Sequence, residues 1–102
     1  MKDKKLNIFG TPYQIRFVDS IKVDEEDSCM VGECDSSIQL IRVCTKDRLG
    51  NELSEDLIKQ NLCHEMVHAI LNEGQYLAYS EDEPLVEWLV RNIYSIVKQK
   101  IL

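Results

Sequence analysis

The two histidines of this chain, His64 and His68, lie four residues apart, and Glu65 follows the first of them. Side chains four residues apart on a helix project from one face, so both imidazoles can reach one metal ion. Zinc accepts imidazole nitrogens at about 2.0–2.1 Å in a tetrahedral shell. Glu65 could take a proton from a zinc-bound water that the cation has already acidified. The segment His64-Glu65-Met66-Val67-His68 therefore predicts a zinc centre that hydrolyses peptide bonds.

The alternative for this motif is that both histidines are ordinary helix residues whose ring nitrogens bond to neighbours. The pattern fixes three positions, and a chance match in a chain of this size is on the order of a few in a thousand. The chain has no other histidine, and the motif falls within a predicted helix. On that helix one stripe is formed by Leu57, Asn61, His64, His68 and Leu71. The spacing and the helical context favour a metal site over the alternative.

The third ligand must come from elsewhere, because catalytic zinc usually has three protein ligands and one water. Without a third histidine, we expect a carboxylate or a thiolate, from the helix that packs against the motif helix. One broad face of that last helix is formed by Glu83, Val86, Glu87, Val90, Tyr94 and Val97. Metal coordination would explain an acid at Glu83, and Glu87 could hydrogen-bond a zinc-bound histidine from one turn later. Glu83 is the preferred ligand, with Glu87 as the alternative; each could instead be an ordinary helix acid.

The motif and the segment from Glu83 to Val90 together resemble the gluzincin type of zinc metallopeptidase, especially small phage and mobile-element proteins related to the ImmA/IrrE group. The likeness covers roughly Ser37 to Leu102. It implies that a downstream glutamate, Glu83, is the third ligand and that Glu87 holds a histidine ligand. The family usually has Asp or Asn at the latter position. It also implies that a strand before the motif helix, residues 37–44 here, lines the cleft and pairs with extended substrate.

The elements that must position these residues begin with two helices in the second half of the chain. The first is predicted from Ser54, a good N-cap, to about Asn72, with Gly74 placed to end it. The second is predicted to start between Ser80 and Pro84 and to reach about Lys100. Ser80 with Glu83 fits a capping box, and proline suits a first helical turn.

The first half of the chain is predicted to form strands. Apolar residues within 6–9 lead into the turn signal Gly10-Thr11-Pro12, and residues 13–17 then alternate between apolar and polar, which together indicate a hairpin. Residues 23–28 are acidic and predict a loop, and residues 29–34 predict a short strand. The strongest strand pattern is Ser37 to Cys44, before a turn at residues 47–51. We expect an α+β fold of three or four antiparallel strands packed against two helices, a minimal zincin-like domain spanning residues 1–102.

Composition limits the partners and the compartment. The formal charge of −6 argues against duplex nucleic acid and anionic membranes as partners. No apolar run follows the basic start Met1–Lys5, so a cytoplasmic protein is expected. The four cysteines lack the Cys-x-x-Cys spacing of a zinc knuckle and are expected to be reduced core thiols. These are Cys29, Cys34, Cys44 and Cys63.

The function predicted from the sequence is a zinc metalloendopeptidase that cleaves a protein or peptide substrate, with Glu65 as general base. Such enzymes often use Tyr or His to stabilise the oxyanion. The available tyrosines, Tyr76, Tyr79 and Tyr94, are more simply explained as half-buried aromatics. Two other hypotheses stay open. One is a metal-binding regulatory or interaction module without turnover, and the other is a metal-free helical interaction module.

Overall fold

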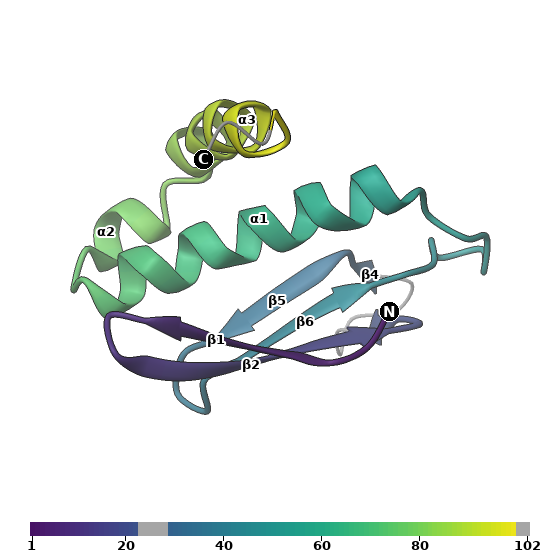
Figure 1. The fold of residues 1–102 in the computed structure, drawn as a ribbon, viewed down its shortest axis with the longest axis horizontal. Coiled ribbons are helices and arrows are strands. Elements are labelled where there is room, and N and C mark those ends of the chain that lie inside the picture. The colour runs from purple at the N-terminus through teal and green to yellow at the C-terminus, as the bar shows by residue number, and fades with distance from the viewer. Residues whose placement is uncertain (23–28, 100–102) are drawn as a thin grey trace.

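The computed structural model describes residues 1–22 and 29–99, arranged as a sheet covered by helices in successive layers (Figure 1). The main sheet contains β1 (Lys4–Ile8), β2 (Thr11–Val18), β5 (Gly32–Asp35) and β6 (Leu40–Cys44). A second, two-stranded sheet pairs β3 (Ile21–Lys22) with β4 (Cys29–Met30). The helices are α1 (Glu55–Glu73), α2 (Leu77–Ser80) and α3 (Glu83–Val97). The predicted α+β class, with strands first and helices after them, is confirmed.

The main sheet is mixed, with strand order β1-β2-β6-β5. Strands β1 and β2 are antiparallel, and so are β5 and β6, as predicted. Strands β2 and β6 run parallel, from the pair Gln14↔Leu40 to the pair Val18↔Cys44, so the expectation of a wholly antiparallel sheet is wrong at this pair. A parallel pair needs a long connection, and residues 19–39 between the two strands provide one.

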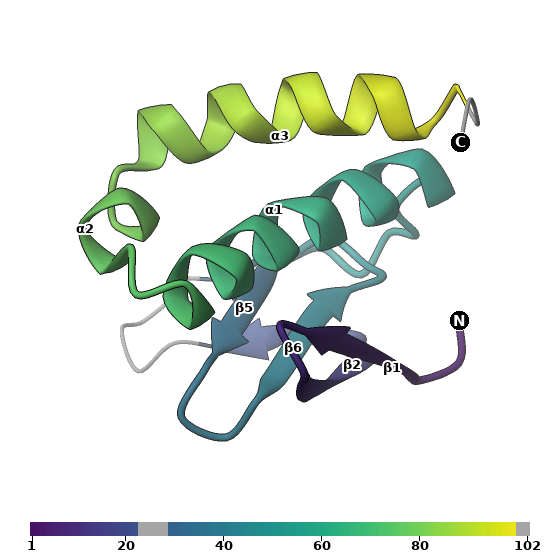
Figure 2. The same cartoon turned by 60° about the vertical axis from the view of Figure 1, so that its left-hand side comes forward.

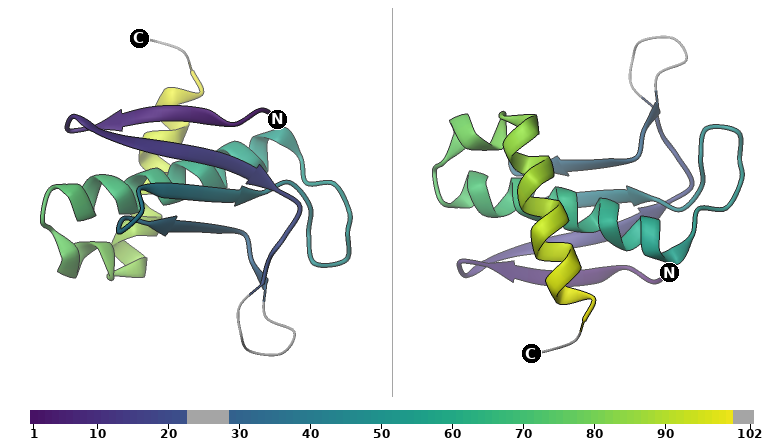
Figure 3. Two further views of the ribbon diagram at one scale, coloured as in Figure 1. Left: turned by 90° about the horizontal axis from the view of Figure 1, so that it is seen from below. Right: turned by 90° about the horizontal axis from the view of Figure 1, so that it is seen from above.

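This strand order differs from the expectation that the strand at residues 37–44 lines the substrate cleft. The predicted strand Ser37–Cys44 corresponds to β6, which lies inside the sheet between β2 and β5. The two edges of the sheet are β1 and β5, on opposite sides in both views of Figure 3, and β5 has the more extensive contact with α1. Residues 36–39 form a turn, in which the Asp35 carboxylate accepts a hydrogen bond from the Ser37 amide at 3.1 Å. The open backbone edge near α1 therefore belongs to Gly32–Asp35.

Three local features differ from their predicted limits. The first hairpin turns at Phe9 and Gly10, which both have positive φ (51° and 82°), so Thr11 and Pro12 belong to β2. This turn is typical of two-residue hairpins. The strand predicted at 29–34 is divided at Val31 into β4 and β5. The acidic loop predicted at 23–28 lies outside the described residues.

Helix α1 is apolar on two sides because it lies between the sheet and α3 (Figures 1 and 2). Its N-cap is Ser54, as predicted, whose hydroxyl accepts a hydrogen bond from the Leu57 amide at 3.1 Å. The side toward the sheet carries Ile58, Leu62, Met66 and Ala69. The side toward α3 carries Cys63, Val67 and Leu71, against Val86 and Val90. The motif residues His64 and His68 project from the surface of α1 that lies between these two apolar sides.

The second predicted helix starts after an extra turn. Helix α2 occupies Leu77–Ser80, so Ser80 cannot cap α3, and the predicted capping box is wrong. The N-cap is Asp82, whose carboxylate accepts a hydrogen bond from the Leu85 amide at 3.2 Å. Pro84 lies in the first turn of α3, as predicted. Helix α3 ends at Val97, before the predicted end near Lys100, which is outside the described part. Within residues 1–22 and 29–99, no helix is long and apolar enough to cross a bilayer.

Candidate metal centre

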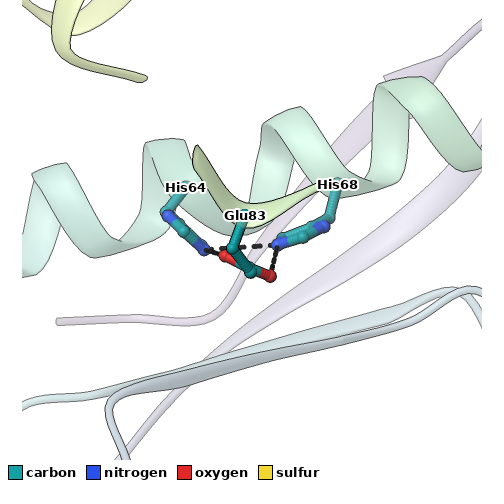
Figure 4. A group of neighbouring side chains, drawn as sticks. All are labelled: His64, His68 and Glu83. Carbon is teal, nitrogen blue, oxygen red and sulfur yellow. Dashed lines mark hydrogen bonds and ion pairs between the residues drawn. The ribbon is translucent and has the colours of Figure 1, made fainter. Parts of the chain in front are cut away.

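His64, His68 and Glu83 converge at one point between α1 and the start of α3 (Figure 4). The two Nε2 atoms of the histidines are 3.2 Å apart. The Glu83 carboxylate approaches both rings, with Oε2 at 3.4 Å from Nε2 of His64 and Oε1 at 3.2 Å from Nε2 of His68. The last helix thus brings its first-turn acid to the motif, where the sequence predicted the third ligand.

The spacing of these donor atoms can be compared with what a zinc ion requires. Bond lengths of about 2.0–2.1 Å in a tetrahedral shell separate neighbouring ligand atoms by about 3.3 Å. The two Nε2 atoms are 3.2 Å apart, and Glu83 approaches them with different carboxylate oxygens, Oε2 at 3.4 Å from His64 and Oε1 at 3.2 Å from His68. Two imidazoles with one carboxylate are also a donor set that zinc accepts while a fourth position stays open. One donor atom from each of the three residues lies within 4.8 Å of the others, so all three can reach one metal ion.

The opposite ring nitrogens of both histidines are held by other residues. Nδ1 of His64 lies 3.2 Å from Oε1 of Glu87, and Nδ1 of His68 lies 3.0 Å from the hydroxyl oxygen of Ser80. A proton on each Nδ1 can be donated to these oxygens, which leaves both Nε2 lone pairs for a metal. Glu87 lies where an orienting residue was predicted. Ser80 has the same role from α2 and is itself buried.

Glu65 points from α1 toward the edge strand β5 and is buried, with 7% of its surface exposed. It packs against Gly32, where a Cβ atom would lie 3.0 Å from both Cγ and Oε2 of Glu65. Burial, and then the negative charges of Glu83 and Glu33, raise the pKa of Glu65 to about 7. A carboxyl group with a pKa near neutrality can both accept and release a proton there.

The electrostatic environment also suits metal binding by His68. Burial lowers the pKa of His68, and the Glu83 carboxylate opposes that change. A lowered pKa keeps the imidazole neutral at neutral pH, and a metal ligand must be neutral. The predicted ligand thus has less competition from protons than a solvent-exposed histidine would have.

Two open cavities flank Glu65 along β5. The first, of about 360 Å³, is lined by Val31, Gly32, Asn61, His64, Glu65, His68, Glu83 and Glu87. The second, of about 490 Å³, is lined by Glu33, Cys34, Glu65, His68, Asn72, Ser80, Glu81 and Glu83. Because both are lined by Glu65, His68 and Glu83, the candidate metal centre lies at their junction. An extended ligand that lies along β5 would occupy both cavities and pass this centre between them.

The tyrosines considered for oxyanion stabilisation lie elsewhere. The Tyr94 hydroxyl donates a hydrogen bond to the Asp56 carboxylate at 2.7 Å and so joins α3 to the start of α1. Tyr76 and Tyr79 are more than half exposed, with ring centroids 5.9 Å apart. Among the described residues that line the two cavities there is no tyrosine, lysine or arginine.

The described cysteines lie in or beside the core, as predicted. Cys44 is buried, and Cys34 and Cys63 are half-buried. Cys63 packs with Val67 against α3, as expected for a core residue next to the motif. Cys34 packs against the sheet core and lines the second cavity, and burial is the main cause that raises its pKa to about 11. Its thiol therefore stays protonated at neutral pH.

Three residues of the site were not identified from the sequence. Gly32 leaves room for Glu65, Ser80 holds His68, and Asn61 lines the first cavity one turn before His64. The only signal for Gly32 was a glycine within a strand pattern, which can mark a close approach of another group. Asn61 was on the predicted stripe, but Ser80 was assigned to a helix cap.

Comparisons with known proteins assign no family to this chain. No protein-family model matches it, and neither the curated proteins nor the solved structures searched gave a match.

Proposed function

We propose that this chain is a small zinc-dependent metallopeptidase that hydrolyses peptide bonds of a protein or peptide substrate. The observation that carries the proposal is the convergence of Nε2 of His64, Nε2 of His68 and the Glu83 carboxylate, whose two oxygens lie 3.4 Å from His64 and 3.2 Å from His68. A buried glutamate beside these three groups supplies the proton acceptor that hydrolysis requires. The likeness of the motif to gluzincin-type sites supports the same conclusion.

Each site residue has a separate task in this proposal. When bound, zinc would acidify a water molecule and polarise the scissile carbonyl. Glu65 accepts a proton from the attacking water and then donates it to the leaving amine, so its carboxylate returns to the starting state. Glu87 and Ser80 orient the two imidazoles through their Nδ1 atoms.

The edge strand β5 offers a binding mode for an extended substrate. Its neighbour on one side is β6, and it is the last strand of the sheet on the other. A peptide that adds to this edge would form main-chain hydrogen bonds, which do not depend on its sequence. Both cavities are lined by residues of β5, so such a peptide would pass Glu65 with its carbonyl near the metal centre.

A second candidate function is metal binding without turnover, in a regulatory or interaction module. One observation favours it: the described residues lining the two cavities include no tyrosine, lysine or arginine to stabilise an oxyanion. Side-chain donors there are weaker, as with Asn61 at the first cavity. The metal-free hypothesis has support too, because spacings of 3.2–3.4 Å also suit hydrogen bonds between histidines and a carboxylate.

Metal analysis combined with one variant separates these functions. Purified protein should contain one zinc per chain and should cleave peptides in a mixed peptide library, with products identified by mass spectrometry. Glu65→Gln should keep the zinc and lose at least about 100-fold in cleavage rate, because the proton acceptor is gone. Full cleavage by Glu65→Gln would contradict the mechanism. Stoichiometric zinc without cleavage supports the binding module, and failure to bind zinc contradicts both functions.

A further inference from the structure

A third cavity, of about 270 Å³, lies beside the metal centre between the start of α1 and the end of β6. Its apolar walls are Val31, Cys44, Leu53 and Leu57, and its polar lining consists of Ser20, Lys46, Asp47, Arg48 and Asn61. Leu57, in the first turn of α1, is an aliphatic residue that is 39% exposed. This cavity has no part in the proposed hydrolysis.

The cavity is continuous with the metal site. Val31 and Asn61 line both this cavity and the one that contains His64 and Glu65. On α1, Asn61 is one turn before His64, and Leu57 is one turn before Asn61. A side chain that leaves a substrate backbone at the metal centre can therefore enter the cavity past Asn61 and reach Leu57.

The size and charge of the cavity select the kind of side chain that would enter. A cavity of about 150 Å³ already accommodates benzene, so 270 Å³ is enough for one leucine-sized group. The Asp47 carboxylate is held by the amides of Leu49 and Asn51, at 2.8 and 2.9 Å, and these bonds help to lower its pKa. The Lys46 ammonium lies 4.0 Å from the exposed carboxylate of Asp19. Among the lining residues, the two positive charges of Lys46 and Arg48 outweigh the one negative charge of Asp47, which disfavours a basic side chain.

We propose that this cavity is a specificity pocket that binds the aliphatic side chain of a substrate residue next to the scissile bond. The inference rests on the proposed function, since it assigns the pocket to the same site. Asn61 lies at the junction of this cavity with the one that contains His64. Its side-chain amide has no hydrogen-bond partner within the described residues, so it is available to the peptide backbone. Leu57 and Leu53 contribute the apolar contact, and Lys46 with Arg48 exclude lysine and arginine.

The test uses zinc-loaded full-length protein and three peptidyl hydroxamates that differ only in the residue beside the chelating group: glycine, leucine or lysine. Hydroxamate binding to zinc does not require turnover, so calorimetry measures the pocket separately from catalysis. We expect the leucyl compound to bind about tenfold more tightly than the glycyl compound, from burial of its side chain. The lysyl compound should bind more weakly than the glycyl compound.

A pair of variants assigns the preference to this cavity. Leu57→Gln should reduce the leucyl preference to less than threefold while zinc content is unchanged. The matched control is Ile70→Gln, on the same helix with 43% exposure, which is not among the residues lining the cavity and should keep the preference.

The outcomes separate the pocket from the proposed function. Equal affinity of the three compounds for zinc-loaded protein would overturn the pocket and leave the metallopeptidase proposal standing, and this comparison needs no variant. A leucyl preference that survives in Leu57→Gln would also overturn the assignment. If zinc or all three hydroxamates fail to bind, the open metal centre itself is contradicted, and the pocket with it.

Discussion

Gly32 and Glu65 are in direct contact across the gap between β5 and α1, and a Cβ atom at residue 32 would lie 3.0 Å from the Glu65 carboxylate oxygen Oε2. This contact fixes the side chain that is proposed to move the proton. A side chain at residue 32 would force Glu65 to shift, because its Cβ atom would lie only 3.0 Å from Cγ and Oε2 of Glu65. Gly32 is therefore tied to the position of the general base.

Gly32→Ala is expected to lower cleavage by up to about tenfold, because the added Cβ forces the general base to shift and even a small misplacement slows the reaction. The backbone of Gly32 does not need a positive φ, so alanine can adopt it. Zinc content should remain near one per chain, since the ligands are untouched. Peptide cleavage and metal analysis on the same sample check this prediction, and unchanged cleavage would contradict the role of the contact.

Glu83→Gln and Glu87→Gln should distinguish the metal ligand from the orienting residue. Glu83 contacts both Nε2 atoms, so its amide variant should lose most zinc binding. Glu87 contacts only Nδ1 of His64, so its variant should still bind zinc, at most about 10–100-fold more weakly. Competition with a zinc chelator measures both affinities. Glu81→Gln is the control for the loss of one negative charge, and a larger loss in Glu87→Gln than in Glu83→Gln would reverse the assignment.

Ser80→Ala should weaken zinc binding by about 10–100-fold, because the hydrogen bond that orients His68 is removed. The effect should appear in the zinc affinity rather than in the free energy of unfolding without metal. Ser95→Ala is a suitable control, since Ser95 is an exposed α3 residue whose hydroxyl bonds only to the Asn92 carbonyl, at 3.0 Å. Equal zinc affinities of the two variants would show that Ser80 does not orient His68.

The buried Tyr13 should make the fold sensitive to alkaline pH. Its hydroxyl donates a hydrogen bond to Glu73 at 2.6 Å, and burial followed by that bond raises the pKa of Tyr13 to about 12. The unfolded chain releases this proton near pH 10 but the folded chain does not. The stabilisation is therefore complete below pH 10 and is lost as the pH rises toward 12.

Tyr13→Phe tests this dependence by urea unfolding at pH 8 and pH 11. At pH 8 the variant should be less stable by about 1.5–3 kcal/mol, because a hydrogen bond to a charged group is lost. Between pH 8 and pH 11 it should lose less stability than the original chain. A parallel decline of both proteins would contradict the prediction. Tyr94→Phe is the comparison, because it removes a tyrosine hydroxyl that donates a more exposed hydrogen bond, to Asp56.

Much of the fold and the core of the site follow from local sequence. The spacing of His64 and His68 places both rings on one helix face in any structure that keeps the helix. Ser54 caps α1 as predicted, because capping depends on a hydroxyl and an amide three residues apart. The α+β order is likewise given by hydrophobic periods of two and then of about 3.6.

Other features depended on contacts between distant residues, and only the tertiary structure decided them. The parallel pairing of β2 with β6 made β5 the edge strand, so Gly32 meets Glu65. The extra turn α2 moved Ser80 from a predicted cap to His68. The crossing of α3 over α1 brought Glu83 within 3.4 Å of both histidines. Helix periodicity and capping are set within a few neighbouring residues, whereas strand order and helix crossing follow from how the whole core packs together.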